Sequence, residues 1–139
     1  MAYNQLFLDS DTLLDLFFER QPFSQYTQLL LAECMAKKIN LNTSALIVAN
    51  MSYIMSKRLG KNTSKEKIKE LVELLNVLPF DGEAITFALH SDFTDFEDAI
   101  QHFIAKKHQC DLIITRNIKD YKNSTIPVFT PEQFLRSIL

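Results

Sequence analysis

Short apolar runs that alternate with longer segments of helical spacing constrain this sequence more than any other feature. The runs cover residues 5–8, 39–43, 77–80, 111–115 and 126–129. Each run is too short to form a helix but long enough to form a buried strand. A chain that alternates such strands with helices builds βαβ units, which give a mainly parallel sheet with helices on both faces. We therefore expect a three-layer α/β sandwich.

Helical spacing of apolar residues predicts the intervening helices. They are expected at residues 11–19, 22–38, 44–59, 63–75, 81–90, 94–108 and 130–139, with a turn or short helix at 117–121. Ser10 or Asp11, Ser44, Asp81 and Thr130 are suited to cap helix starts. Capping boxes are expected at Thr63–Glu66 and Thr94–Glu97, where a Glu three residues on completes the pattern.

Length and composition favour one domain over residues 1–139 of an ordinary soluble protein. Fifteen basic and seventeen acidic residues give a net charge of −2, which excludes a strongly basic nucleic-acid-binding tail but not binding through a local patch or a metal. Cys34 and Cys110 are isolated and form no zinc-binding pattern, so we expect a reduced, cytoplasmic protein. No apolar run approaches the roughly 20 residues of a membrane span, and the first residues lack the features of a secretory signal.

Polar side chains directly follow two of the predicted strands. Asp9 and Asp11 follow the first, and Arg116, Asn117 and Asp120 follow the strand at 111–115. Ligands of an open parallel sheet bind beyond the carboxyl ends of its strands. We therefore expect these side chains to meet at one edge of the sheet.

The helix predicted at 94–108 adds two more acids to this edge. It must run antiparallel to the strand that it precedes, so its first turn lies at the carboxyl edge, and Asp95 and Asp98 share one flank of it. Glu97 lies about 100° away on the other flank and is better explained as a capping-box residue. Asn50, in the helix predicted at 44–59, is an inward polar residue one or two turns from the same edge.

Three remote segments thus deliver acids to one place: Asp9, Asp98 (with Asp95) and Asp120. Gathered carboxylates raise one another's pKa, and a divalent cation relieves their repulsion. Hard oxygen ligands without a soft ligand favour Mg²⁺ or Mn²⁺, which can bind a phosphodiester and activate water. Each acid taken alone is explained as well by helix capping, the helix dipole or a turn.

Three segments carry a resemblance to a known family. They read LFLDSDTLLD near the start, DFEDAIQHFIAKKHQCDLIITRNIKDY in the last third and IPVFTPEQFL at the end. This chain resembles PIN domains, and most of all the bacterial group related to the toxins of toxin–antitoxin pairs (VapC-like). The resemblance implies a five-stranded parallel sheet of order 3-2-1-4-5 and metal-dependent cleavage of single-stranded or structured RNA. It also implies a Mg²⁺ or Mn²⁺ site, often a homodimer, and an antitoxin protein as partner.

The resemblance also implies roles for individual residues. Acidic ligands fall on Asp9, Asp98 (with Asp95 adjacent) and Asp120, and hydroxyl positions near the metal fall on Ser10 and Thr115, beside Arg116. Asn117 stands where the family commonly has Asp, and Asn50 where it usually has Glu. An amide oxygen carries no charge, so the ion should bind more weakly than in the family.

Two other functions remain open at this stage. Asn50 favours a binding module, a PIN fold with a weakened site that holds RNA or a protein without cutting. A response-regulator-like phospho-acceptor domain also has acids at its strand ends, but it would need a lysine after a late strand, where this chain has Thr130 and Pro131.

Two surface features allow both a structural and a functional interpretation. The lysine-rich stretch 57–69 is explained either as solvated helix faces or as a phosphate-contacting patch. Phe17, Phe18, Phe23 and Tyr26 are explained either as core residues or as a contact for a second copy or an antitoxin.

Overall fold

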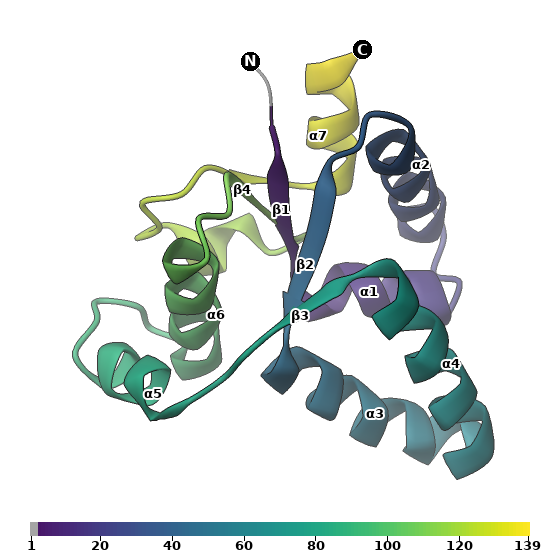
Figure 1. Ribbon diagram of the computed structural model, residues 1–139, viewed down its shortest axis with the longest axis horizontal. Coiled ribbons are helices and arrows are strands. Elements are labelled where there is room, and N and C mark those ends of the chain that lie inside the picture. The colour runs from purple at the N-terminus through teal and green to yellow at the C-terminus, as the bar shows by residue number, and fades with distance from the viewer. Residues whose placement is uncertain (1–2) are drawn as a thin grey trace.

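Five parallel strands form one sheet with helices packed on both faces (Figure 1), as the computed structural model of residues 3–139 shows. The strands are β1 (Gln5–Leu8), β2 (Asn40–Ser44), β3 (Asn76–Leu78), β4 (Leu112–Ile114) and β5 (Val128–Phe129). Their order is β3-β2-β1-β4-β5, and all four pairings are parallel. The predicted fold class and strand order are confirmed.

Strand β1 lies at the centre of the sheet, and its position explains its composition. Leu6 pairs with Leu41 on one side and with Leu112 on the other. Leu6, Phe7 and Leu8 are fully buried, because a central parallel strand is covered on both faces by helices. The residue that leaves this strand therefore emerges in the middle of the carboxyl edge, between the ends of its neighbours.

Seven α-helices and one 3₁₀ helix surround the sheet in the part of the chain that the structure describes. They are α1 (Ser10–Phe17), α2 (Phe23–Ala36), α3 (Ala45–Leu59), α4 (Lys61–Leu74), α5 (Gly82–Leu89), α6 (Phe96–Lys107), η1 (Ile118–Tyr121) and α7 (Pro131–Ile138). Figure 1 shows α5 and α6 on one side of the sheet, α2 and α7 on the other, and the paired α3 and α4 projecting past the sheet at the lower right. None of these helices is long and apolar enough to cross a lipid bilayer.

The predicted helix starts are correct at three places. Ser44 caps α3 by accepting a hydrogen bond from the Ile47 amide, Asp81 caps α5, and Thr130 forms a full capping box at α7. At α1 the cap is Asp9, whereas Ser10 or Asp11 was expected. Asp9 therefore combines a capping role with its position at the end of β1.

Both capping boxes predicted from a Thr–x–x–Glu pattern are wrong. Helix α4 begins at Lys61, directly after Gly60, whose φ of 86° ends α3 and leaves Thr63 inside the next helix. Helix α6 begins at Phe96, and the Asp95 carboxylate accepts a hydrogen bond from the Asp98 amide at 2.9 Å. An Asp caps a helix at least as well as a Thr, so Asp95 takes the role expected of Thr94.

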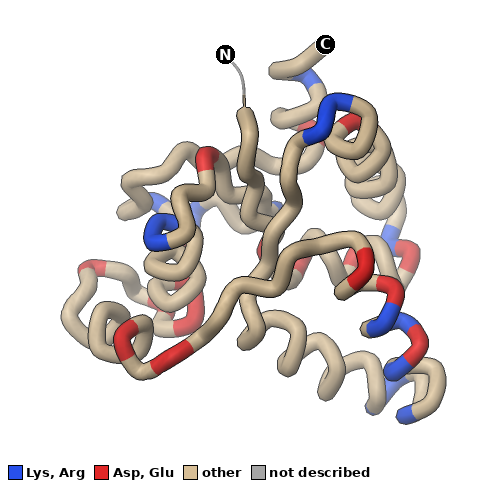
Figure 2. The backbone as a smooth tube through the Cα atoms, viewed as in Figure 1, with Lys and Arg blue, Asp and Glu red and all other residues tan. Residues whose placement is uncertain are grey.

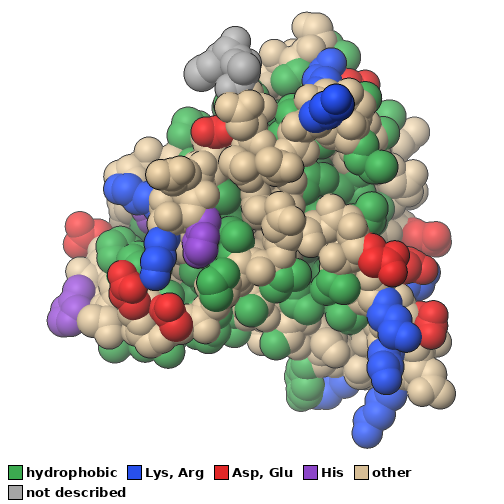
Figure 3. All heavy atoms as spheres, in the orientation of Figure 1, with side chains coloured by type: hydrophobic (Ala, Val, Ile, Leu, Met, Phe, Trp, Pro, Cys, Tyr) green, Lys and Arg blue, Asp and Glu red, His purple; other side chains and the backbone are tan. Residues whose placement is uncertain are grey.

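The lysine-rich stretch lies along the end of α3 and along α4. Figure 2 marks basic residues along the far end of this pair, and Figure 3 shows their side chains gathered there, at the lower right of the view. Most of these side chains are exposed. Phosphate binding by this surface stays a prediction.

Candidate acidic site at the carboxyl edge

Asp9 is the buried centre of the candidate site. Its Oδ1 accepts a hydrogen bond from the Ser10 amide at 2.8 Å, and its Oδ2 accepts from the hydroxyls of Tyr121 at 3.0 Å and Thr115 at 3.2 Å. Burial, followed by repulsion from Asp11, raises the pKa of Asp9 to about 6. The three hydrogen bonds favour the charged form and limit that rise.

Thr115 connects Asp9 to a second acid. Its Oγ1 lies 3.2 Å from Asp9 Oδ2 and 3.1 Å from Asp11 Oδ2, and it accepts a hydrogen bond from the Asn117 amide at 3.1 Å. A hydroxyl has one proton, so Thr115 donates to one of the two carboxylates at a time. The Arg116 amide also donates to Asp11 Oδ2, at 3.1 Å. Burial is the main reason that the pKa of Asp11 is raised.

Asp98 approaches this pair from α6. Burial, followed by repulsion from Asp9, Asp95, Asp120 and Asp11 in that order, raises its pKa to about 8. Acids from three remote segments of the chain therefore act electrostatically on Asp98. Asp9, Asp95 and Asp120 lie near enough to influence the pKa of Asp98, and the binding of one ion by these acids stays a prediction.

Asp120 and Asn117 occupy the rim of the site. Both are exposed, and Asp120 lies on η1, just before the buried Tyr121. The Asn117 backbone amide donates a hydrogen bond to Thr115 Oγ1, and the Asn117 side chain lies at the surface. The short helix predicted at 117–121 is confirmed as η1.

Asn50 and Glu97 form a separate pair beside the buried acids. The Asn50 side chain donates to Glu97 Oε1 at 3.4 Å, and both line a hollow of about 270 Å³ that also includes Ser10 and Tyr53. Glu97 was expected to be a capping-box residue, and the structure instead places it facing α3. The pair joins α3 to α6 at the edge of the site.

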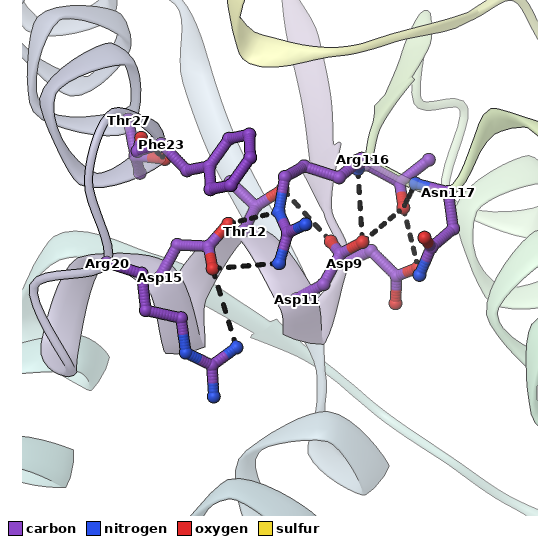
Figure 4. Close-up of polar contacts among 10 residues, drawn as sticks. Asp9, Asp11, Thr12, Asp15, Arg20, Phe23, Thr27, Arg116 and Asn117 are labelled. Carbon is purple, nitrogen blue, oxygen red and sulfur yellow. Dashed lines mark hydrogen bonds and ion pairs between the residues drawn. The ribbon is translucent and has the colours of Figure 1, made fainter.

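Sequence reasoning missed three residues of this region. Asp11 was noted at the sheet edge but not chosen as a site residue, and Tyr121 and Asp15 were not considered. Asp15 is 1% exposed at its side chain, and it binds Arg116 Nη2 through Oδ1 at 3.0 Å and Arg20 Nη1 at 3.5 Å. Figure 4 shows Arg116 reaching from the end of β4 to Asp15 on α1. A buried Asp inside the apolar run of α1 was the available signal, since such a charge requires a partner.

The donor chemistry of the acids fits a hard divalent cation. All the candidate ligands are oxygen atoms, and the raised pKa values of Asp9 and Asp98 reflect burial and a repulsion that a cation would relieve. Within residues 3–139, however, no three acidic, His or Cys side chains converge closely enough to form a ready-made metal site.

The fold and site together define a doubly wound α/β protein with an acidic pocket at its carboxyl edge, and comparisons with known proteins identify it further. A family model for the PIN domain matches residues 5–119, so this chain belongs to the PIN-domain family. It is 31% identical over 139 residues to ribonuclease VapC1 of Aquifex aeolicus (strain VF5), covering 96% of this chain and 95% of that protein. The response-regulator-like alternative is thereby wrong.

Solved structures share the same fold at low identity. VapBC2 from Rickettsia felis, bound to a promoter DNA fragment, matches with a TM-score of 0.69 and 15% identity, covering 91% of this chain and 98% of that one. FitAcB from Neisseria gonorrhoeae matches with a TM-score of 0.70 and 20% identity over 91% and 98%. VapC20 from Mycobacterium tuberculosis, a toxin that cleaves the sarcin–ricin loop, matches with a TM-score of 0.62 and 16% identity over 78% and 86%.

Proposed function

We propose that this protein is a metal-dependent endoribonuclease and the toxin component of a toxin–antitoxin pair. The observation that carries this proposal is the cluster at the carboxyl edge, where Asp9 and Asp98 have pKa values raised by burial and by mutual repulsion. The ribonuclease relative, which matches over nearly the whole of both chains, supports the same activity.

In this proposal Asp9, Asp98 and Asp120 hold Mg²⁺ or Mn²⁺, and Asn117 serves as a neutral ligand. When bound, the ion supplies charge that stabilises a phosphodiester and its leaving oxygen during hydrolysis. Thr115 orients Asp9 and Asp11, and Tyr121 fixes the Oδ2 of Asp9 by its hydrogen bond. Hydrolysis by water then leaves 3′-hydroxyl and 5′-phosphate ends, as the family resemblance implies.

The supporting residues act one step further from the phosphodiester. Ser10 donates its amide to Asp9, Arg116 donates its amide to Asp11, and Asp95 holds the first turn of α6 through the Asp98 amide. Asn50 keeps α3 against α6 through Glu97. Their contribution is to orient the ligating carboxylates.

The partners follow from the same relatives. We propose a single-stranded or structured RNA as substrate, an antitoxin protein that inhibits the site, and a homodimer as the assembly. One similar structure is a toxin–antitoxin complex from Klebsiella pneumoniae, and VapBC2 from Rickettsia felis and FitAB are each bound to a DNA fragment. The cytoplasm is the compartment that provides such an RNA, and it keeps the buried, unpaired Cys34 and Cys110 reduced.

A binding module that does not cut is the second candidate. It is favoured by Asn50 and Asn117 at positions where the family has acids, and by the lack of three converging carboxylates in residues 3–139. Calorimetric titration with Mn²⁺ separates the two functions. An ion that binds no more tightly than about 10 mM, weaker than the roughly millimolar end of protein Ca²⁺ sites, would favour the binding module.

Cleavage of RNA by the purified protein tests the proposed function. We expect cleavage with Mn²⁺ or Mg²⁺, none with EDTA, and none with Asp9→Asn. Asp92→Asn, which replaces an exposed acid before α6, is the matched control and should cleave normally. Cleavage that persists with Asp9→Asn would rule out this mechanism.

A further inference from the structure

A cavity of about 370 Å³ lies beside the acidic site, between the starts of α2 and α7. Its lining includes Pro22, Phe23, Tyr26, Arg116, Pro131 and Glu132. Its volume falls within the range of small-ligand pockets, roughly 300–1,000 Å³. Arg116 follows β4 and Pro131 follows β5, so the cavity opens at the same edge of the sheet as the acids.

Arg116 lies between the cavity and the acidic site and contacts both. Its backbone amide faces the acids and donates to Asp11, whose carboxylate reaches Asp9 through the Thr115 hydroxyl. Its side chain extends the other way, and its guanidinium lies 4.1 Å from the centre of the Phe23 ring. Figure 4 shows this side chain beside Phe23 and directed to Asp15.

The chemistry of the lining favours a flat ring over a phosphate. The Arg116 charge is already paired with the buried Asp15 carboxylate, so it is not free to bind an anion. What remains is the guanidinium plane, the aromatic rings of Phe23 and Tyr26, and two prolines. Unstacked bases of single-stranded RNA stack on aromatic rings and on Arg guanidinium planes.

We propose that this cavity binds one base of the RNA strand, next to the phosphodiester that would be cleaved at the acidic site. The proposal rests on the proposed ribonuclease function and adds to it a position at which the substrate is recognised. Phe23 and Tyr26 are the stacking surfaces, and Asp15 is a positioning residue that keeps the Arg116 plane in place. Glu132 lies on the rim, where its Oε2 binds Arg136 and its Oε1 can accept hydrogen bonds from the edge of a base.

The test combines altered RNA with altered protein. A single-stranded oligoribonucleotide that the wild type cuts is made in versions that each lack one base. Affinity is measured in EDTA by fluorescence anisotropy, and cleavage is measured with Mn²⁺. We expect one abasic position near the cut to weaken binding by the wild type by about 5- to 150-fold, the range of a base–aromatic stack. Phe23→Leu and Tyr26→Leu should bind the intact RNA more weakly than the wild type does. For these two variants, removing the base at that position should cause no further loss of affinity.

Phe87→Leu is the matched control, because Phe87 on α5 is as exposed as Phe23, at 39% against 37%. It should keep the full abasic penalty of the wild type. The two independent variants, Phe23→Leu and Tyr26→Leu, are checked for folding by circular dichroism, so that a misfolded one does not decide the result.

The outcomes separate this proposal from the proposed function. If the wild type cuts intact RNA, but the wild type and Phe23→Leu lose the same affinity when the base is removed, the ribonuclease function stands and the base site is overturned. A wild type that neither binds nor cuts RNA overturns both. Variants that bind RNA normally but lose a protein partner identify the cavity as a protein-docking site, which also overturns the base site.

Discussion

The two halves of the acidic site are built differently. The inner acids, Asp9 and Asp11, receive hydrogen bonds from Thr115, Tyr121 and backbone amides, which hold their carboxylates in place. The outer acids, Asp98 and Asp120, come from α6 and η1, and burial and four acidic neighbours raise the pKa of Asp98 to about 8. Hydrogen bonds thus order the inner acids, whereas burial and repulsion dominate the environment of the outer acid Asp98.

The largest effect should come from removing the outer acid Asp98. Asp98→Asn should lower the rate of RNA cleavage by at least ~100-fold, because a charged ligand contributes more than the residues that orient such ligands, whose loss costs about 10- to 100-fold. The same change should raise the melting temperature of the metal-free protein at about pH 8, since it removes a carboxylate that its neighbours repel. Single-turnover cleavage with Mn²⁺ and thermal unfolding in EDTA measure the two effects. A variant that is both inactive and less stable would contradict the comparison.

The buried Asp15 supports the inner acids indirectly, because it pairs with Arg116, whose backbone amide donates to Asp11. Asp15→Asn should lower the free energy of unfolding by about 3 kcal/mol, near the low end for breaking a buried ion pair because Arg116 still reaches water. Since the Arg116 amide binds Asp11, cleavage should fall as well. Chemical denaturation measures the stability. Glu132→Gln, which loosens the exposed pair with Arg136, is the control and should change stability by less than about 1 kcal/mol.

The pH dependence of stability should reveal the repulsion among the outer acids. A carboxyl group whose folded-state pKa is raised binds its proton more tightly in the folded state, so stability falls as pH rises toward the folded-state pKa. For Asp98 this fall continues to about pH 8. In EDTA the melting temperature should therefore drop by a few degrees between about pH 6.5 and pH 8.5.

Two comparisons isolate the Asp98 contribution. Mn²⁺ should reduce the drop for the wild type, and Asp98→Asn should show a smaller drop without metal. Burial lowers the pKa of His102 from 6.5, so the unfolded state binds this proton more tightly and His102 makes stability rise with pH near pH 6.5. The wild type and Asp98→Asn share this contribution, so the difference between their slopes isolates Asp98. Equal slopes for the wild type and Asp98→Asn would show that Asp98 is not held in a repulsive environment.

The sequence predicted the strands, the helices and the acids that meet at the carboxyl edge, because hydrophobic periodicity and βαβ geometry determine where a residue leaves its strand. The strand order came from the family resemblance, since periodicity does not encode which strands are neighbours. The Thr115 link between Asp9 and Asp11 was not predictable, because it depends on side-chain directions across two strands. The Asn50–Glu97 pair was missed for a similar reason, since it requires the packing of α3 against α6.

The smallest effect tests a local detail on which the sequence and the structure disagree, at the start of the helix that carries Asp98. Asp95→Ala should cost about 1 kcal/mol, the usual value of a helix cap, because Asp95 accepts the Asp98 amide. Thr94→Ala should change stability by less than about 0.5 kcal/mol, as expected of a surface position. Asp95→Asn separates capping from charge, since Asn keeps an oxygen acceptor and removes the repulsion on Asp98. Chemical denaturation of the three variants decides between the caps, and a larger loss from Thr94→Ala than from Asp95→Ala would restore the capping box inferred from the sequence.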